Sequence, residues 1–293
     1  MRMKKSPGER LFDALNGLFM IALVIATLYP FVYVLMASFS EPGRLMAHRG
    51  ILLWPAGFSW ESYKLVFDNE MIKVGYFNTL FYVIAGTFLN IVMTSLGAYT
   101  LSRRNVMLAT PVMLLVTFTM FFSGGLIPSY LLMHDLHLLD TRWALVIPGA
   151  ISTWNLIIMR TSFQGVPVSL EESARIDGAN DWTILFRIVL PLSLPVLAVM
   201  VLFYAVAHWN GYFGAMIYLR DRELFPLQLV LREILLTNSV ESMTSSVSGI
   251  DKYFISETIK YATIMVATLP ILFLYPFLQK YFVKGVMIGA IKE

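Results

Sequence analysis

A short polar segment between two apolar stretches contains the residues whose types and spacing could do chemistry. It covers residues 165–182 and includes four carboxylates, Glu171, Glu172, Asp177 and Asp181. If the segment folds rigidly, it exposes carboxylates and small side chains at the membrane surface. A rigid knob of this kind suits the docking of a partner protein and the transmission of force into the neighbouring apolar segments.

The order of residues in this segment predicts a short helix at about residues 169–178, a sharp turn and a second short helix. Ser169 and Glu172 have the spacing of a capping box, in which each side chain binds a free backbone amide of the first turn. Glu171 places a negative charge near the positive end of the helix. Gly178 can adopt the left-handed backbone conformation that ends a helix.

The second short helix also has a sequence that specifies its start. Asn180 or Asp181 can cap it. The chain then passes through Ile188 and Leu190 to Pro191, where the next apolar stretch begins. We therefore expect the knob to be attached at both ends to membrane-spanning segments.

Simpler interpretations compete with functional ones for several polar residues. A local capping role alone would account for Glu172, and a solvated face or an intrahelical pair explains Arg175 and Asp177 equally well. The two His in residues 134–137 could share a metal ion with Asp140. Because that segment is a short turn between apolar stretches, we favour interfacial polar residues and expect no metal site.

Polar and aromatic residues in two apolar stretches are candidates for a path for a polar solute. His208, Trp209 and Asn210 end one stretch, and Asn155 lies within another. These side chains could line a sugar path through stacking and hydrogen bonds. Trp is also a common anchor at membrane interfaces, and an intramembrane Asn can serve helix packing, so both alternatives stay open.

The composition places the chain in a membrane. Of its 293 residues, 57% are hydrophobic and 14% are charged, with a mean hydropathy of +0.68, whereas soluble domains have about 45–50% apolar and about 25% charged residues. The basic residues behind the net charge of +3 flank apolar runs, which argues against nucleic-acid binding. The absence of Cys excludes disulfides, thiolate nucleophiles and Cys metal ligands.

Six apolar stretches are long enough to cross a bilayer, because about 20 residues span its core as a helix. We expect helices rather than a barrel, since the stretches are continuously apolar and do not alternate. They lie at residues 18–37, 76–101, 110–131, 143–159, 191–209 and 261–278. The expected fold class is an all-α membrane protein with six transmembrane helices.

The distribution of basic residues predicts that both termini are cytoplasmic. The pieces that lie inside in this orientation are shorter in total than those outside, yet they hold slightly more than half of the 22 Lys and Arg. The long external loops are residues 38–75 and 210–260, the second with a possible helix at 227–236. An N-terminal part, a core of spans two to six and a C-terminal tail are expected at residues 1–72, 73–283 and 284–293.

The polar segment resembles the signature of the transmembrane subunits of bacterial binding-protein-dependent ABC importers. In that family Glu-Ala-Ala is followed after three residues by Gly, after nine more by Ile, and one residue later by Leu-Pro. The residues at these spacings are Glu172, Ser173, Ala174, Gly178, Ile188, Leu190 and Pro191. Ser173 is the one departure, and it is small like the Ala that it replaces.

The resemblance extends over most of the chain and points to the carbohydrate-importer branch. Residues 208–210 and the ending at residues 279–292 carry this finer likeness. Within the branch, the chain is similar to permeases for oligo- or polysaccharides, including those of alginate importers. The implied location is the bacterial inner membrane, and the implied fold is that of type I importer permeases.

The resemblance also implies how the chain works with others. A coupling helix would dock in a cleft of an ATPase subunit, where Glu172 pairs with an Arg. The implied coupling residues are Glu171, Glu172, Ser173, Ala174, Asp177 and Gly178, framed by Ser169, Ile188, Leu190 and Pro191. The implied partners are a second, different permease subunit, two nucleotide-binding ATPase subunits, an external solute-binding protein, the carbohydrate and the lipid bilayer, with alternating access as the mechanism.

ATP and Mg are then expected in the ATPase subunits, and this chain is expected to bind no cofactor and to catalyse no reaction. Consistently, its sequence has no G-x-x-x-x-G-K-S/T phosphate loop. The alternative is a self-contained secondary transporter or channel, which would place ionisable residues inside its spans. Here Asp13 and His208 stand only near the ends of apolar stretches.

Overall fold

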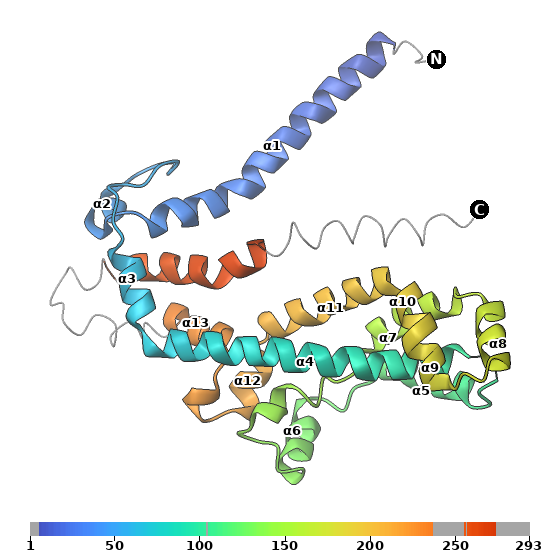
Figure 1. Cartoon of the computed structure of the whole chain (residues 1–293). Helices are drawn as coiled ribbons and strands as arrows, with labels where there is room; N and C mark the ends of the chain where they lie inside the picture. Colours follow the sequence, from blue (N-terminus) through green and yellow to red (C-terminus); the bar gives the residue numbers. More distant parts are fainter. Residues whose placement is uncertain (1–5, 104, 237–254, 256, 274–293) are drawn as a thin grey trace. The chain divides into compact units, whose positions relative to one another are not determined.

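The computed structural model describes residues 6–103, 105–236, 255 and 257–273. Over these residues the regular structure is helical, apart from an isolated bridge between Ser40 and Phe58. The elements labelled in Figure 1 follow the order α1 (Pro7–Ser38), α2 (Pro42–Ala47), α3 (Glu61–Asp68), α4 (Glu70–Ser102), α5 (Ala109–Phe121), α6 (Leu126–Asp135), α7 (Thr153–Gln164), α8 (Val168–Ile176), α9 (Asp181–Ile184), α10 (Leu190–Leu192), α11 (Leu194–Trp209), α12 (Phe213–Tyr218) and α13 (Leu227–Leu236).

Shorter helical turns and one later helix complete the described structure. The turns are the 3-10 helices η1 (Arg142–Leu145) and η3 (Arg222–Leu224) and the π-helix η2 (Leu185–Val189). Residues 257–273 are helical and include residues 261–273 of the expected sixth span. The end of that span at 274–278, the family-like ending at 279–292 and the expected tail at 284–293 lie outside the described residues. The helix expected at residues 227–236 is confirmed as α13.

The chain forms two compact units. The first comprises residues 1–69 and 233–268, and the second comprises residues 70–232 and 269–293. The first unit contains the first span and the loop that follows it. The second contains the polar segment and every residue that the sequence marks as a candidate for function.

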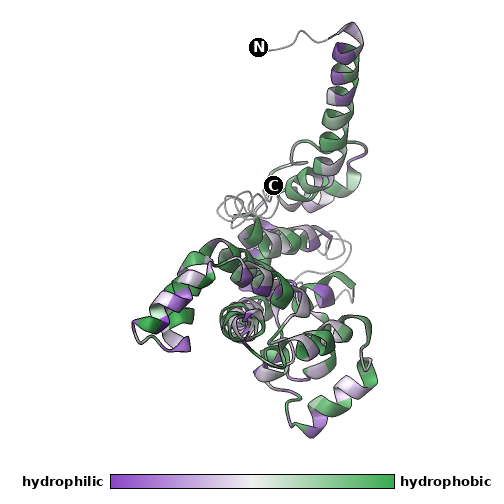
Figure 2. Ribbon diagram, turned by 90° about the vertical axis from the view of Figure 1, so that its right-hand side faces the viewer, coloured by the Kyte–Doolittle hydropathy of each residue, from purple (hydrophilic) through white to green (hydrophobic). Residues whose placement is uncertain are grey.

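In the first unit, α1 begins where the sequence supplies a complete cap. Ser6 Oγ accepts a hydrogen bond from the Glu9 amide at 3.3 Å, and the Glu9 carboxylate accepts one from the Ser6 amide at 2.8 Å. Pro7 takes the first helical position, where no amide donor is needed. The helix begins with hydrophilic residues next to the N-terminus (Figure 2) and becomes apolar further along.

In the second unit, α4 is the helix around which the others pack, and its main neighbours are α11 and α7 (Figure 1). Its buried face is made of small and polar residues at intervals of four, Tyr82, Gly86, Asn90, Thr94 and Ala98. Small side chains let membrane helices approach closely, and polar ones bond across the interface. This face therefore sets how closely α11 can approach.

Three of the expected spans differ from straight, full-length helices. The third is broken between α5 and α6, which meet at 117°, because Gly125 has φ +84° and ψ 178°, a conformation almost restricted to glycine. The fifth bends by 86° at Ser193, and α11 starts only at Leu194. The fourth is reduced to α7, whose 12 residues extend about 18 Å.

These breaks change which helices could cross a membrane alone. Among the described residues, α1 and α4 are single helices that are long and apolar enough to do so. The pair α5 and α6 and the bent segment that ends in α11 reach that length only if each pair counts as one span. The irregular backbone at residues 146–152 precedes the short α7, and such backbone is tolerated at membrane depth where it lines a cavity.

The close approach of α4 and α11 generates a first prediction. A Cβ atom at Gly86 would lie 2.4 Å from Nε2 of His208, so the Gly86→Ala variant must displace the imidazole. We expect a loss of stability of about 1–3 kcal/mol, as for other overpacked interiors. Thermal unfolding of the purified protein in lipid discs measures this loss.

Gly17→Ala is the matched control, because a Cβ atom there meets nothing within 4 Å and the residue lies inside α1. Ala favours a helix over Gly by about 0.5–1 kcal/mol, so this variant should be as stable as the parent or more so. Equal melting temperatures for the Gly86→Ala variant and the parent would show that α4 and α11 are not packed as described.

Candidate functional site

The polar segment folds as expected into two short helices, but its first helix starts differently. The helix α8 begins at Val168 with Pro167 as the preceding cap residue, and no side chain caps its start. The expected capping box of Ser169 and Glu172 is therefore wrong. Because Pro167 already directs the chain into the helix, Ser169 stands inside the first turn instead of before it.

The end of α8 confirms the role expected for Gly178. Its φ is +83°, and the amide of Ala179 donates to the carbonyl of Ala174 at 2.9 Å while the Gly178 amide donates to Arg175 at 3.1 Å. These two bonds make a Schellman motif, which satisfies carbonyls that the helix end leaves free. The turn that follows α8 is thus fixed by backbone geometry.

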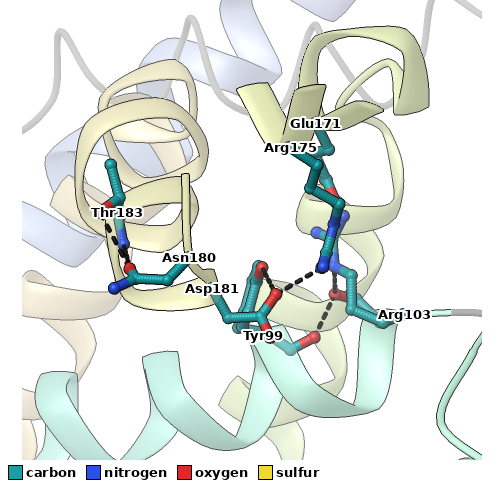
Figure 3. A network of polar contacts seen from close by, with 8 residues as sticks. Tyr99, Arg103, Glu171, Arg175, Asn180, Asp181 and Thr183 are labelled. Carbon is teal, nitrogen blue, oxygen red and sulfur yellow. Dashed lines mark hydrogen bonds and ion pairs between the residues drawn. The ribbon is translucent and has the colours of Figure 1, made fainter. Parts of the chain in front are cut away.

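The start of the second helix is capped by Asn180, one of the two candidates. Its side-chain oxygen accepts hydrogen bonds from the amide of Thr183 at 2.8 Å and from its hydroxyl at 2.9 Å (Figure 3). From α9 the chain continues through η2 to α10. Ile188 and Leu190 pack on the hydrophobic core, whereas Pro191 is exposed in α10.

A buried ion pair fastens α8 to the end of α4. Arg103 directly follows α4 and pairs with Glu171, and their side chains are only 12% and 7% exposed. Arg103 also donates to the carbonyl of Phe163 at 3.3 Å, and its guanidinium lies 4.7 Å from the centre of the Tyr99 ring. Burial lowers the pKa of Arg103 below its usual value. Glu171 therefore faces the protein interior, away from any partner that docks on the exposed face of α8.

A second, more exposed pair lies beside it. Arg175 of α8 pairs with Asp181 of α9, and the hydroxyl of Tyr99 donates to the same carboxylate at 3.3 Å (Figure 3). The side chains of Arg175 and Asp181 are 45% and 62% exposed. Together the two ion pairs join α4, α8 and α9 into one polar network at the end of α4.

The opposite face of α8 is open. Glu172, Ser173, Asp177 and Gly178 are exposed, and Ala174 is half-buried against the core. Ile176 is 87% exposed on the same short helix. The structure thus separates the expected coupling residues into a buried anchor, Glu171, and an exposed surface that carries the carboxylates of Glu172 and Asp177. Three large apolar side chains of α8 are also exposed, Val168, Leu170 and Ile176.

A cavity of about 410 Å³ lies between α4, α11 and the loop before α7. Of the residues expected on a substrate path, Asn155 and His208 line it. Trp209 is buried and packs edge-on against Tyr76 at 6.1 Å between ring centres, and Asn210 is exposed next to Gly211. The four candidates are therefore not brought together, and two of them meet at one cavity.

Two levels of buried hydrogen bonds define the cavity wall. His208 Nε2 lies 2.7 Å from Oδ1 of Asn90, whose amide nitrogen donates to the carbonyl of Gly149. One turn along α4, Thr94 and Tyr204 are joined at 2.7 Å between their hydroxyl oxygens. The Ser152 amide donates to the same Tyr204 oxygen at 3.1 Å. Each level ties α4, α11 and the loop before α7 together.

Sequence reasoning missed the partners of His208. The signal was present as the repeat of small and polar residues at intervals of four in α4, which includes Gly86, Asn90 and Thr94. In an apolar stretch, such residues at one helical face indicate an interface or a cavity. The composition and length of the apolar stretch do not by themselves indicate this face of α4.

Within the described part of the chain, the His and Asp residues at 134–140 do not come together as a group of three or more potential metal ligands. Asp140 instead accepts hydrogen bonds from the amides of Asp221 and Arg220, both at 2.8 Å. These bonds lower the pKa of the Asp140 carboxyl. Asp140 therefore links its own loop to the loop that contains Arg220 and Asp221.

The buried pair generates a second prediction. Arg103→Ala leaves the Glu171 carboxylate buried without its cation, which costs about 3–5 kcal/mol. Arg175→Ala is the matched control, since removing an exposed pair costs about 0–1 kcal/mol. Thermal unfolding of both variants in lipid discs should therefore show a large fall in the melting temperature of Arg103→Ala and little change in that of Arg175→Ala. Similar falls in both variants would contradict the description of Glu171 as a buried anchor.

Comparison with known proteins gives one consistent family. A model of the family "Binding-protein-dependent transport system inner membrane component" matches residues 83–288. The chain is 44% identical over 284 residues to the polygalacturonan/rhamnogalacturonan transport system permease protein YtcP of Bacillus subtilis, covering 97% of this chain and 99% of that protein. It is 41% identical to the protein LplC of the same organism, covering 99% and 98% of the two chains.

A solved structure agrees with the sequence matches. One chain from the crystal structure of a bacterial ABC transporter involved in the import of the acidic polysaccharide alginate superposes with a TM-score of 0.90 at 34% identity. The match covers 95% of this chain and 99% of that one. The chain therefore belongs to the family of binding-protein-dependent transport system inner membrane components, as a permease subunit of a sugar or polysaccharide ABC importer with the all-α fold of type I permeases.

Proposed function

We propose that this chain, together with a second and different permease subunit, forms the path by which an acidic oligo- or polysaccharide enters the cell, and that ATP hydrolysis in two partner subunits drives the transport. One observation carries this proposal above the others. The helix α8 is exposed on one face and anchored on its other face to the end of α4, the helix that also lines the cavity. A docked partner and a bound solute would therefore act on the same rigid helix.

The exposed face of α8 supports docking of an ATPase subunit. Its carboxylates, Glu172 and Asp177, suit contact with a cationic side chain, and the largely exposed Ile176 suits an apolar cleft. Desolvated apolar anchors rimmed by polar groups provide much of the energy of protein interfaces. ATP and Mg would bind in the partner, since this sequence has no phosphate loop of its own.

The connection from α8 to the cavity supports coupling by alternating access. Arg103 ties α8 to α4, which then runs as one helix of 33 residues past Asn90. Asn90 contacts His208 of α11 and Gly149 before α7. A displacement of α8 would move α4, and the movement would reach both elements that close the cavity with it.

The chemistry of the cavity supports a carbohydrate, including an acidic one. Its lining contains no Asp, Glu, Lys or Arg among the described residues. The polar side chains that line it are those of Asn90, Asn155, Ser152, His208 and three tyrosines, Tyr82, Tyr204 and Tyr218. Absence of carboxylates avoids repulsion of a uronate, and amide, hydroxyl and imidazole groups can bond sugar hydroxyls and carboxylates.

The chain would also have a defined orientation in the membrane and a partner outside it. Both termini would be cytoplasmic, in keeping with the positive-inside bias. An external solute-binding protein would then deliver the carbohydrate to the loops on the other side. Polygalacturonan or rhamnogalacturonan fragments and alginate fragments are the substrates to test first, because the relatives named above are described with these polymers.

Coupling is tested by reversing one exposed charge on α8. We expect Glu172→Lys to abolish uptake of the carbohydrate by proteoliposomes that contain the full importer, because the partner's cation then meets a like charge. Glu61→Lys makes the same charge change on the exposed surface of α3, on the external side in this orientation, and should leave the amount of copurifying ATPase subunit unchanged. The two readouts are uptake and the amount of ATPase subunit that copurifies with the chain. Normal uptake by the Glu172→Lys protein would refute the docking role of α8.

The substrate path is tested within the cavity. Asn155→Leu keeps a side chain of similar size but removes the amide, so we expect a several-fold lower rate of uptake of oligogalacturonate or alginate oligomers, with the ATPase subunits still bound. Asn210→Leu is the matched control, because Asn210 does not line the cavity. The measurement is the rate of uptake of each oligomer by the two variants and by the parent protein. Equal loss in the two variants, or no loss in Asn155→Leu, would remove the cavity from the path.

A further inference from the structure

The loop after α2 exposes a group of large apolar side chains that the proposed function does not use. We call residues 51–54 the apolar tip. Ile51, Leu53 and Trp54 are 71%, 64% and 81% exposed, whereas Leu52 between them is buried at 1%. In the sequence, His48, Arg49 and Gly50 precede the tip and Pro55 directly follows it. Such a cluster in an external loop requires a partner or a solvent that is itself apolar.

The chain at the apolar tip folds back alongside α1, the first span. The amide of Leu52 donates to the hydroxyl of Tyr29 at 3.2 Å, and the Leu52 side chain shares a small core with Ala37. Figure 1 shows the loop after α2 turning back in the direction of α1. Tyr29 lies nine residues before the end of α1 at Ser38, so its Cα is roughly 13 Å below that end. The tip therefore lies beside the last turns of α1, not beyond them.

The position of α1 in the bilayer sets the depth of the tip. The helix extends about 48 Å, more than the roughly 30 Å of the hydrocarbon core. Its first turns carry Glu9, Arg10 and Asp13, so the excess length belongs on the N-terminal side. The apolar remainder, which contains no buried residue in its most hydrophobic window, then crosses the core up to the region of Met36. Tyr29 is thereby placed in the half of the bilayer where α1 ends.

The backbone of the tip suits the interfacial part of this leaflet. Irregular backbone can enter lipid only where its polar groups are satisfied. The Leu52 amide has Tyr29 as its partner and the Ile51 carbonyl lies 3.4 Å from His48 Nε2, whereas the other backbone polar groups of the tip can bond to lipid headgroups and interfacial water. Arg49 before the tip can extend to the headgroups, and Trp is a residue typical of membrane interfaces.

We propose that the apolar tip inserts into the bilayer leaflet at which α1 ends, with Ile51, Leu53 and Trp54 in contact with lipid. In the orientation of the proposed function this is the outer leaflet. The lipid surface is the occupant that the geometry favours, because the tip lies beside the last turns of α1, whose most hydrophobic window has no buried residue. Insertion would hold the loop at residues 39–69, with its aromatic cluster around Phe39 and Trp60, at the membrane surface.

The natural absence of Cys makes the depth of the tip measurable. Single Cys replacements of Ile51 and Leu53 carry a nitroxide spin label in the full chain, kept with its copurifying subunits in discs of native membrane. Leu28→Cys on the exposed side of α1 is the lipid control. Gly43→Cys on α2 is the water control, since a side chain there meets nothing within 4 Å. Collision with oxygen reports lipid, and collision with a water-soluble nickel chelate reports water.

The labels at positions 51 and 53 are expected to show a several-fold higher ratio of oxygen to nickel collisions than the label at 43, close to the ratio at 28. A ratio equal to that at 43 would place the tip in water and overturn the proposal. Low collision rates with both reagents would show that protein covers the tip, which also overturns it. Because the measurement needs neither transport nor ATP, its result is independent of the substrate and coupling roles proposed above.

Discussion

The buried pair of Arg103 and Glu171 is the interaction on which the arrangement of the second unit depends. It joins the end of the longest helix of that unit to a helix of nine residues that would otherwise be held only by its flanking turns. Burying two charges is costly, and the pair is stable only because each partner neutralises the other and the guanidinium also binds a carbonyl and an aromatic ring. The geometry that satisfies these groups also fixes which side of α8 faces outward.

The helix α4 connects this ion pair to the cavity. Because the buried face of α4 repeats small and polar residues every fourth position, α11 can approach closely and exchange hydrogen bonds with it. In a membrane, where apolar association between helices contributes little, such contacts decide which helices stay together. The exposed face of α8 and the cavity are thus connected through one packed helix, α4, which is the physical basis of the coupling proposed above.

Breaks in the apolar segments also leave backbone groups free to bond at the cavity. Gly125 allows a turn of 117° between α5 and α6, and the bend at Ser193 separates the knob from α11. The chain before α7 is irregular where Gly149 and Ser152 offer a carbonyl and an amide to the polar contacts of the cavity. Straight helices would have satisfied these backbone groups internally and left no acceptor for Asn90.

The sequence by itself determined the membrane class, the apolar segments, the turn at Gly178 and a cap at Asn180 or Asp181, because each depends on composition or on residues a few positions apart. It also carried the family spacing from Glu172 to Pro191. Only the tertiary structure decided that Glu171 faces inward while Glu172 faces outward, and that His208 meets Asn90. These contacts join residues 68 and 118 positions apart, and no local pattern records such pairings. The start of α8 differs from the expected capping box for a local reason, because the helix begins directly after Pro167 and Ser169 falls inside its first turn.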